Sequence, residues 1–212
     1  MLILYMREQD WHEMKEFIPH DMILKAQVFK YKYLAVPGAV IILSFFLRGF
    51  FEESRWIPII ALVVYFLLLC LFRFRRVYPD HEAGAVVAPI NGKITNIDAL
   101  ATGNVLTIQK PFFESSEITT CTKTDIINRL DTEGERVSWQ IECANSKVFY
   151  TENPDYQAVL IGIAAGNAKC EVFIPAKYDL FVEIGSVVDA GITMIAGNGE
   201  KEVGDESKDS DD

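Results

Sequence analysis

Apolar residues follow two different patterns along the chain. Two nearly continuous apolar runs, Leu34–Phe51 and Ile57–Phe72, come first and are separated by the short polar segment Glu52–Trp56. From Ala85 onward, short runs rich in Val, Ile and Thr recur about every 8–12 residues between Gly, Asn and Pro turn signals. The first pattern predicts a pair of apolar helices, and the second predicts a mainly β domain.

The two apolar runs are 18 and 16 residues long, near the lower limit for crossing a hydrocarbon core of about 30 Å. Basic residues flank the pair on both outer sides: Lys25, Lys30 and Lys32 before it, and Arg73, Arg75 and Arg76 after it. By the positive-inside rule, both termini are expected in the cytoplasm. The pattern therefore predicts a transmembrane hairpin over residues 34–72 and a multi-pass protein of the inner (cytoplasmic) membrane. A pair of buried core helices or a re-entrant loop is the alternative.

The two ends of the chain differ from the middle. Residues 1–33 form an N-terminal cytoplasmic or interfacial segment, in which Trp11, Met14 and Phe17 recur at helical spacing before Pro19. This helix is expected either on the membrane surface or against the β domain. Residues 200–212 contain seven acidic residues and two lysines, which is five of the ten excess negative charges of the chain, and predict a disordered tail.

The β domain is expected over residues 79–199. The predicted strand segments are 85–89, 92–98, 104–109, 115–122, 136–142, 147–151, 157–164, 170–175, 180–185 and 192–196. Near the end, Gly185–Gly191 has the Gly-x-x-Val-x-x-Gly spacing typical of barrel-sandwich hybrid folds, with Val188 facing the core. The sequence therefore predicts a barrel-sandwich-hybrid-like β domain behind the helical hairpin. The lysine hairpin of biotinyl and lipoyl carriers is missing from it.

Residues that could carry chemistry show little organisation. Four cysteines without a CxxC pair predict reduced thiols, and three histidines without ligand spacing predict no metal site. There is no basic stripe on the β domain, so nucleic acid is not an expected partner. Four carboxylates are expected on a solvated face: Glu114, Glu117, Asp125 and Asp131.

Short motifs from residue 72 onward follow one another in a recognisable order. They are Phe-Arg with a later Arg and Pro at 72–79, VAPINGK at 87–93, Ile-Asn-Arg at 127–129, EVFIP at 171–175 and the glycine segment at 185–196. Together with the hairpin, this order resembles the short, membrane-anchored bacterial phosphatidylserine decarboxylases. The resemblance covers about Tyr33–Ala196 and depends on the order of the motifs, because no single one is specific.

The resemblance implies a self-made cofactor. In that family a serine after glycine attacks the preceding carbonyl, the chain is cut, and the serine becomes an N-terminal pyruvoyl group, with an aspartate and a histidine assisting. The pyruvoyl carbonyl then forms a Schiff base with the amine of phosphatidylserine. It accepts electrons as CO2 leaves, which yields phosphatidylethanolamine.

This chain departs from the family at each of those three positions. The aspartate position is Asn91, the histidine position is Ile126 and the serine position is Ala168. Because alanine has no hydroxyl, no ester and no pyruvoyl group can form at Ala168, and no cofactor is expected. A second alignment, which matches 163–165 to the family's Ile-Ala-Gly, treats the serine segment as deleted.

Gly185-Ser186 is the only Gly-Ser pair in the chain. Cleavage there would leave a peptide of 27 residues, too short to build a site. Ser186 is therefore kept as a maturation candidate, but a turn of the closing hairpin is the favoured interpretation.

The resemblance thus predicts a phosphatidylserine decarboxylase-related protein that lacks self-maturation and acts as a non-catalytic, phospholipid-associated or partner-binding module. The alternatives are an active phosphatidylserine decarboxylase and a membrane-anchored β module of unrelated origin. Expected partners are the lipid bilayer, anionic phospholipid, and an oligomer with itself or with an active homologue. Arg73, Arg75 and Arg76 are expected near lipid headgroups, unless they serve only to set topology.

Overall fold

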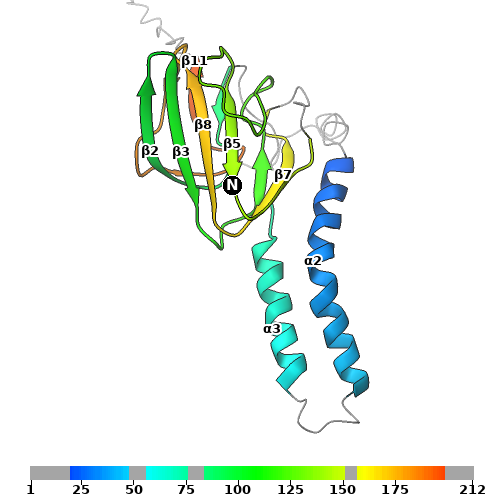
Figure 1. Cartoon of the computed structure of the whole chain (residues 1–212). Coiled ribbons are helices and arrows are strands. Elements are labelled where there is room, and N and C mark those ends of the chain that lie inside the picture. Colours follow the sequence, from blue (N-terminus) through cyan, green and yellow to red (C-terminus); the bar gives the residue numbers. More distant parts are fainter. Residues whose placement is uncertain (1–19, 48–55, 76–83, 151–156, 199–212) are drawn as a thin grey trace, which may run out of the picture.

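The computed structural model describes residues 20–47, 56–75, 84–150 and 157–198. Two helices come first, α2 (His20–Leu47) and α3 (Trp56–Leu71). They lie side by side as a hairpin that projects from one end of a β domain (Figure 1). The boundary expected between residues 33 and 34 falls inside α2, and the predicted acidic tail lies outside the described residues.

The prediction of a transmembrane hairpin in a multi-pass inner-membrane protein is wrong for the described chain. Within the described residues, neither helix combines the length and the apolar character needed to cross a membrane. The apolar run counted from Leu34 to Phe51 continues past the end of α2 at Leu47, and α3 has 16 residues. The N-terminal half of α2 carries three lysines, which interrupt its apolar character.

The prediction of a mainly β domain is confirmed. The strands are β1 (Val86–Val87), β2 (Gly92–Leu100), β3 (Gly103–Lys110), β4 (Glu117–Thr119), β5 (Ser138–Glu142), β6 (Asn145–Val148), β7 (Leu160–Ala165), β8 (Ala168–Pro175), β9 (Tyr178–Leu180), β10 (Val187–Val188) and β11 (Met194–Asn198). Every predicted strand segment overlaps one of them. The strand β10, inside the Gly-x-x-Val segment, was not predicted separately.

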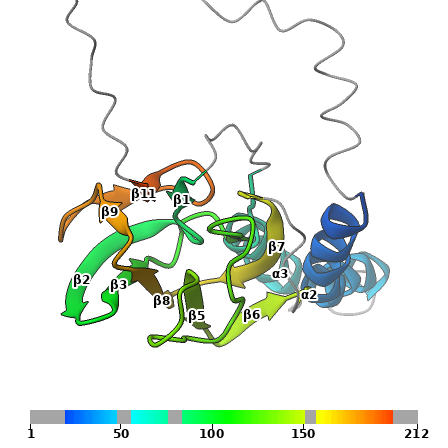
Figure 2. The ribbon, with the colours of Figure 1, turned by 90° about the horizontal axis from the view of Figure 1, so that it is seen from above.

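The strands form three antiparallel sheets. The largest has the order β10-β2-β3-β8-β5, and two smaller sheets have the orders β1-β11-β9 and β4-β7-β6. Viewed from above in Figure 2, the sheets curl around one interior as a half-barrel. Most consecutive strands belong to different sheets, so residues far apart in sequence meet inside the curl.

The interior is filled by the alternating inward side chains of the central strands. On β3, Leu106 and Ile108 are fully buried, and the equally buried Val172 and Cys170 face them from β8. Trp139 on β5 is the largest fully buried side chain. Val188 is also buried in this core, as predicted from the glycine spacing. Burial of such side chains stabilises the fold by about 1.5–3 kcal/mol each.

A second, smaller cluster joins the hairpin to the β domain. The rings of Phe29 and Tyr33 on α2 contact Phe72, with centroids 6.1 and 4.9 Å apart, and Phe29 also contacts Phe149 after β6 at 6.2 Å. We call these four residues the aromatic cluster. It packs beside Ile163 of β7, so the hairpin is attached to the domain by side-chain packing as well as by the chain itself.

Candidate functional site

The turn that carries Asn91 connects β1 to β2, which belong to different sheets. Asn91 is 1% exposed. Gly92 follows with φ +154°, and a Cβ built there would lie 2.5 Å from the backbone oxygen of Gln109 on β3. Only glycine lets β2 approach β3 this closely, so the Asn-Gly pair is fixed here by backbone packing rather than by a two-residue hairpin turn.

The side-chain amide of Asn91 is fully engaged. Its Nδ2 donates to Glu117 Oε1 at 2.8 Å and to the backbone oxygen of Ser115 at 3.1 Å. Its Oδ1 accepts from Arg75 Nη2 at 3.0 Å and from the backbone nitrogen of Ala190 at 3.1 Å. An asparagine can supply donors and acceptors in this way, whereas an ionised aspartate supplies acceptors alone.

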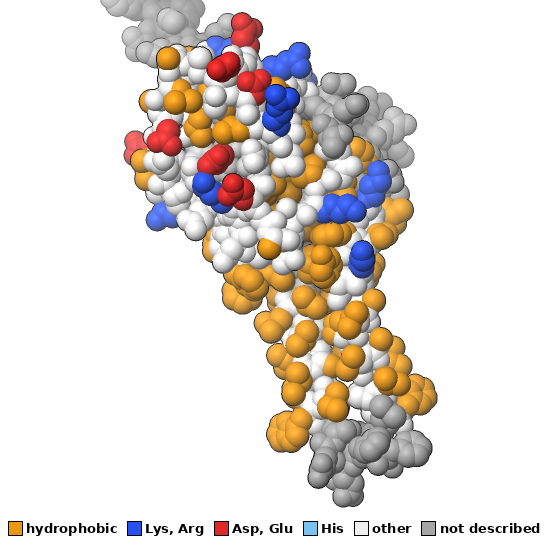
Figure 3. Space-filling model, viewed as in Figure 1, with side chains coloured by type: hydrophobic (Ala, Val, Ile, Leu, Met, Phe, Trp, Pro, Cys, Tyr) orange, Lys and Arg blue, Asp and Glu red, His pale blue; other side chains and the backbone are white. Residues whose placement is uncertain are grey.

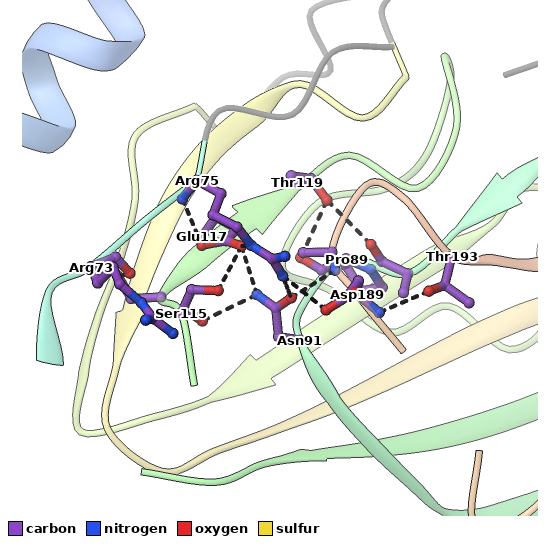
Figure 4. A network of polar contacts seen from close by, with 12 residues as sticks. Arg73, Arg75, Pro89, Asn91, Ser115, Glu117, Thr119, Asp189 and Thr193 are labelled. Carbon is purple, nitrogen blue, oxygen red and sulfur yellow. Dashed lines mark hydrogen bonds and ion pairs between the residues drawn. The ribbon is translucent and has the colours of Figure 1, made fainter. Parts of the chain in front are cut away.

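Glu117, the first residue of β4, is the buried acid at the centre of this network, with no exposed surface. Besides the amide of Asn91, its Oε1 accepts from the hydroxyl of Ser115 at 2.9 Å, and its Oε2 accepts from the backbone nitrogen of Arg75 at 3.2 Å. Arg75 Nε lies 3.4 Å from Oε1 as an ion pair. Figure 4 shows these groups converging from the linker, the β1–β2 turn and β4.

Arg75 connects the network to the surface. Its Nη2 donates to Asp189 Oδ1 at 2.8 Å, and both side chains are nearly half exposed. The hydrogen bond from Arg75 to Asp189 is the largest cause that raises the pKa of the guanidinium, with Glu117 contributing further. Arg75 lies in the linker after α3, so this ion pair and the bonds to Glu117 tie the base of the hairpin to the β domain.

Lys110 is a second buried charge at the same end of the half-barrel. It is 1% exposed, and its Nζ donates to the backbone oxygen of Gly166 at 2.9 Å. Burial lowers the pKa of the Lys110 amine, while Cys143, Glu114 and Glu117 act in the opposite direction.

The resemblance assigns the aspartate, serine and histidine positions to Asn91, Ala168 and Ile126. The structure brings Asn91 and Ala168 to one end of the sheet and leaves Ile126 elsewhere. Ala168 begins β8 opposite Lys110, whose Cα lies 3.1 Å from the Cβ position built at Gly92. Ile126 instead bridges Ser138, which pairs with Phe173 on β8. Phe173 is five residues from Ala168, or about 17 Å along an extended strand.

The remaining predicted positions have local structural roles. Ser186 closes a turn: its nitrogen donates to the oxygen of Glu183 at 3.0 Å, and its hydroxyl accepts from the Glu183 nitrogen at 3.1 Å. Arg73 is exposed, and its backbone oxygen accepts from Ser116. The guanidinium of Arg75 faces Glu117, Asn91 and Asp189 as described above. Arg76 lies outside the described residues.

The expectation that four carboxylates lie on a solvated face is wrong for Glu117 and Asp125. Asp125 is 5% exposed and accepts from the indole Nε1 of Trp139 at 2.7 Å and from the nitrogen of Cys121 at 2.8 Å. Burial raises the pKa of Asp125 to about 6, against the lowering effect of these hydrogen bonds. The local sequence does not indicate this burial, because Trp139 lies 14 residues away on β5.

The network is saturated. Among the described residues, no buried side-chain nitrogen or oxygen lacks a hydrogen-bond partner, and no group of three or more His, Cys, Asp or Glu side chains could hold a metal ion. The charged groups therefore bind one another and fix the base of the hairpin. No family model, no curated protein and no solved structure matches this chain.

Proposed function

We propose that this protein is a non-catalytic relative of the phosphatidylserine decarboxylases, with a barrel-sandwich-hybrid-like domain, that associates with phospholipid surfaces through its helical hairpin. The observation that carries the proposal is the apolar surface of the hairpin. Large apolar side chains are exposed along both helices; on α3 they include Ile57, Ile59, Ile60, Leu62, Val63, Phe66 and Leu67. Figure 3 shows apolar side chains over the visible face of the part of the hairpin that leaves the domain.

So many exposed apolar side chains on one hairpin indicate a surface that is covered by an apolar partner. Exposed apolar patches on monomeric proteins rarely exceed a few hundred Å2 unless they mark an interaction or lipid surface. The apolar part of α2 from Leu34 to Leu47 is about 21 Å long and α3 is about 24 Å long. Both lengths are less than a hydrocarbon core of about 30 Å. The lengths fit helices that enter the interface from one side and do not cross.

Aromatic side chains support the choice of lipid over a protein partner. Phe112 and Phe113 are exposed on the loop after β3, and Phe112 lies with Leu71, at the end of α3, beside Gly166. Tyr31 and Tyr33 are exposed on the facing part of α2. Aromatic residues at the boundary between an apolar and a polar surface are typical of proteins at the membrane interface.

The proposed lack of catalysis follows from the residues at the three positions that the resemblance assigns to the aspartate, histidine and serine. Ala168 has no hydroxyl with which to form a pyruvoyl group, and Ile126 cannot transfer a proton. The amide of Asn91 is committed to Glu117 and Arg75. The groups at these positions support folding of the domain instead of maturation.

Lipid association is tested by flotation of the full chain with phosphatidylcholine vesicles. The wild type should float with the vesicles, and a variant with Ile60→Ser, Val63→Ser and Phe66→Ser should stay in the dense fraction. The matched control replaces Phe181, Ile184 and Val187 by serine; these are comparably exposed apolar residues of the β domain. Equal loss in both variants, or a concentration-dependent dimer that does not float, would reject a lipid surface as the partner.

The loss of catalysis is tested by the intact mass of the chain after expression in membranes. A single uncut chain and no release of CO2 from phosphatidylserine are expected. Two fragments, one with a pyruvoyl end, would instead support the alternative of an active decarboxylase.

A further inference from the structure

We infer that the junction between the hairpin and the β domain selects anionic phospholipid headgroups through a basic collar, defined as Lys25, Lys30, Lys32, Arg73 and Lys147. This inference rests on the proposed lipid association and adds the class of lipid that is bound. It depends on the position of charge relative to the apolar hairpin, and it does not involve the family positions.

The collar is held together by the aromatic cluster. Lys147 on β6 lies over the ring of Phe29, with Nζ 5.9 Å from the centroid. Lys30 follows Phe29, and Lys32 precedes Tyr33 on α2. Both rings contact Phe72, which is followed by Arg73. Three separate segments therefore bring their cations to one level of the molecule.

Lys25 extends the same level on the side of α2 that faces the domain. Its Nζ lies 4.5 Å from the ring centroid of Tyr150 and 3.2 Å from the Tyr150 hydroxyl. A cation over an aromatic face keeps its charge and gains a fixed position. This contact places Lys25 where the polar domain ends and the apolar hairpin begins.

The charge balance of the hairpin is opposite to that of the whole chain. The chain has a net charge of −10, yet α2 contains three lysines against one acidic residue, Asp21, and Trp56–Leu71 contains no charged residue. In Figure 3, blue side chains gather where α2 meets the domain, above the apolar visible surface of the two helices. A negatively charged protein would be repelled by an anionic membrane. A local positive region beside the apolar surface would replace this repulsion with attraction at the place where the hairpin meets the lipid.

The geometry then sets the level of the collar in the interface. When the apolar side chains beyond Leu34 are in the acyl region, the α2 lysines of the collar lie about half a turn to two and a half turns above them, at the level of the headgroups. Anionic lipids attract each such cation, and the attraction decays over a Debye length of about 8 Å at physiological salt. Binding to anionic vesicles should therefore exceed binding to neutral vesicles and should decrease with salt.

The test compares flotation of the full chain with phosphatidylcholine vesicles and with phosphatidylcholine–phosphatidylglycerol vesicles. The wild type should prefer the anionic vesicles. Lys30→Gln with Lys32→Gln should reduce anionic binding on the order of 30-fold, about fivefold for each cation, and should leave neutral binding unchanged. The matched control, Lys123→Gln with Lys177→Gln, makes the same charge change on exposed residues of the β domain and should keep the preference.

Each outcome decides between the two proposals. Equal binding of the wild type to both vesicles, or a preference as large in the Lys30/Lys32 variant as in the wild type, would overturn the basic collar and leave lipid association intact. Equal losses in the collar and control variants would show a general charge effect and also overturn it. Binding to neither vesicle would overturn the proposed function itself. A urea unfolding curve for each variant verifies that the fold is retained.

Discussion

Replacing Asn91 with aspartate, the residue that the family resemblance would place there, tests the interpretation of the buried network. The substitution keeps the size of the side chain and changes the donor Nδ2 into an acceptor oxygen. That nitrogen donates to Glu117 Oε1 at 2.8 Å and to the backbone oxygen of Ser115 at 3.1 Å. In the Asn91→Asp variant, the new carboxylate oxygen therefore faces two other acceptors, Glu117 Oε1 and the backbone oxygen of Ser115, at a buried position.

The size of the effect follows from two contributions. Loss of the donor leaves buried acceptors unsatisfied and costs about 1–3 kcal/mol. Two ionised carboxylates 2.8 Å apart would repel by about 6 kcal/mol at an effective dielectric constant of about 20. The folded variant reduces this repulsion by holding a proton on one carboxyl, and Arg75, 3.0 Å from Oδ1, offsets part of the rest. We expect the free energy of unfolding to fall by about 3 kcal/mol at neutral pH.

The deficit should shrink in acid. At neutral pH the folded variant holds a proton that the unfolded chain releases, because an unfolded aspartate titrates near about pH 4. The folded state binds more protons, so the stability of the variant falls as pH rises. Near pH 4 the unfolded aspartate is about half protonated, so little of the cost of holding the proton in the folded state remains, and the hydroxyl of the folded carboxyl can donate to Glu117 as the amide did.

The assay is urea unfolding of the wild type and of Asn91→Asp from about pH 4 to pH 8, a range that covers the carboxyl titration. Asn96→Asp is the matched control, because Asn96 Nδ2 also donates to a carboxylate, Asp98 Oδ2 at 2.7 Å, but at an exposed site. Solvent screening should limit its cost to less than about 1 kcal/mol. Equal stability losses in the two variants, or a loss at position 91 that does not depend on pH, would refute the reasoning.

Three further predictions use the same unfolding assay. Asp125→Asn should remove a pH-dependent contribution to stability. Burial raises the pKa of Asp125 to about 6, above the value of about 4 for an unfolded aspartate, so the folded state binds the proton more tightly. Wild-type stability should therefore fall by about 2 kcal/mol relative to the variant between pH 4 and pH 7, and parallel pH profiles would contradict this. Gly92→Ala should cost about 3 kcal/mol, because its Cβ would lie 2.5 Å from the Gln109 backbone oxygen. Gly38→Ala in α2, where the new Cβ meets only Tyr65 at 3.9 Å, should instead stabilise the protein by about 0.5–1 kcal/mol, and a loss there would indicate that the helix is packed differently.

The strands could be predicted from the sequence because their signal is local. Each segment that alternating apolar residues and turn glycines predict as a strand overlaps an observed strand. The glycine spacing around Val188 also predicts the burial of that side chain, which the structure confirms. The two helices were also predicted from their apolar runs. The transmembrane interpretation was wrong because a run of apolar letters does not show where a helix ends, and α2 ends at Leu47.

The candidate site could be predicted only in part, because its contacts are distant in sequence. Asn91 was identified from a motif, but its partners Arg75, Glu117 and Ala190 come from the linker, β4 and the segment after β10. Glu117 stands between polar and apolar residues in a short strand, and this pattern does not distinguish a buried acid from an exposed one. Curling of the sheets brings these segments together, and the order of strands in the sheets is not encoded in any local pattern.

The hydrogen bonds of Asn91 also protect the chain from a slow chemical reaction. In an asparagine–glycine pair, the backbone nitrogen of the glycine can attack the side-chain carbonyl carbon and expel ammonia, and hydrolysis of the resulting ring leaves an aspartate or isoaspartate. In the folded protein the amide is held by Glu117, Ser115, Arg75 and Ala190, so it cannot rotate into position for attack. Each excursion to the unfolded state removes this protection, and the product is the carboxylate that the folded network disfavours. The lifetime of the protein is therefore expected to depend on how often it unfolds, and mass spectrometry of protein aged at increasing urea concentration would measure this dependence.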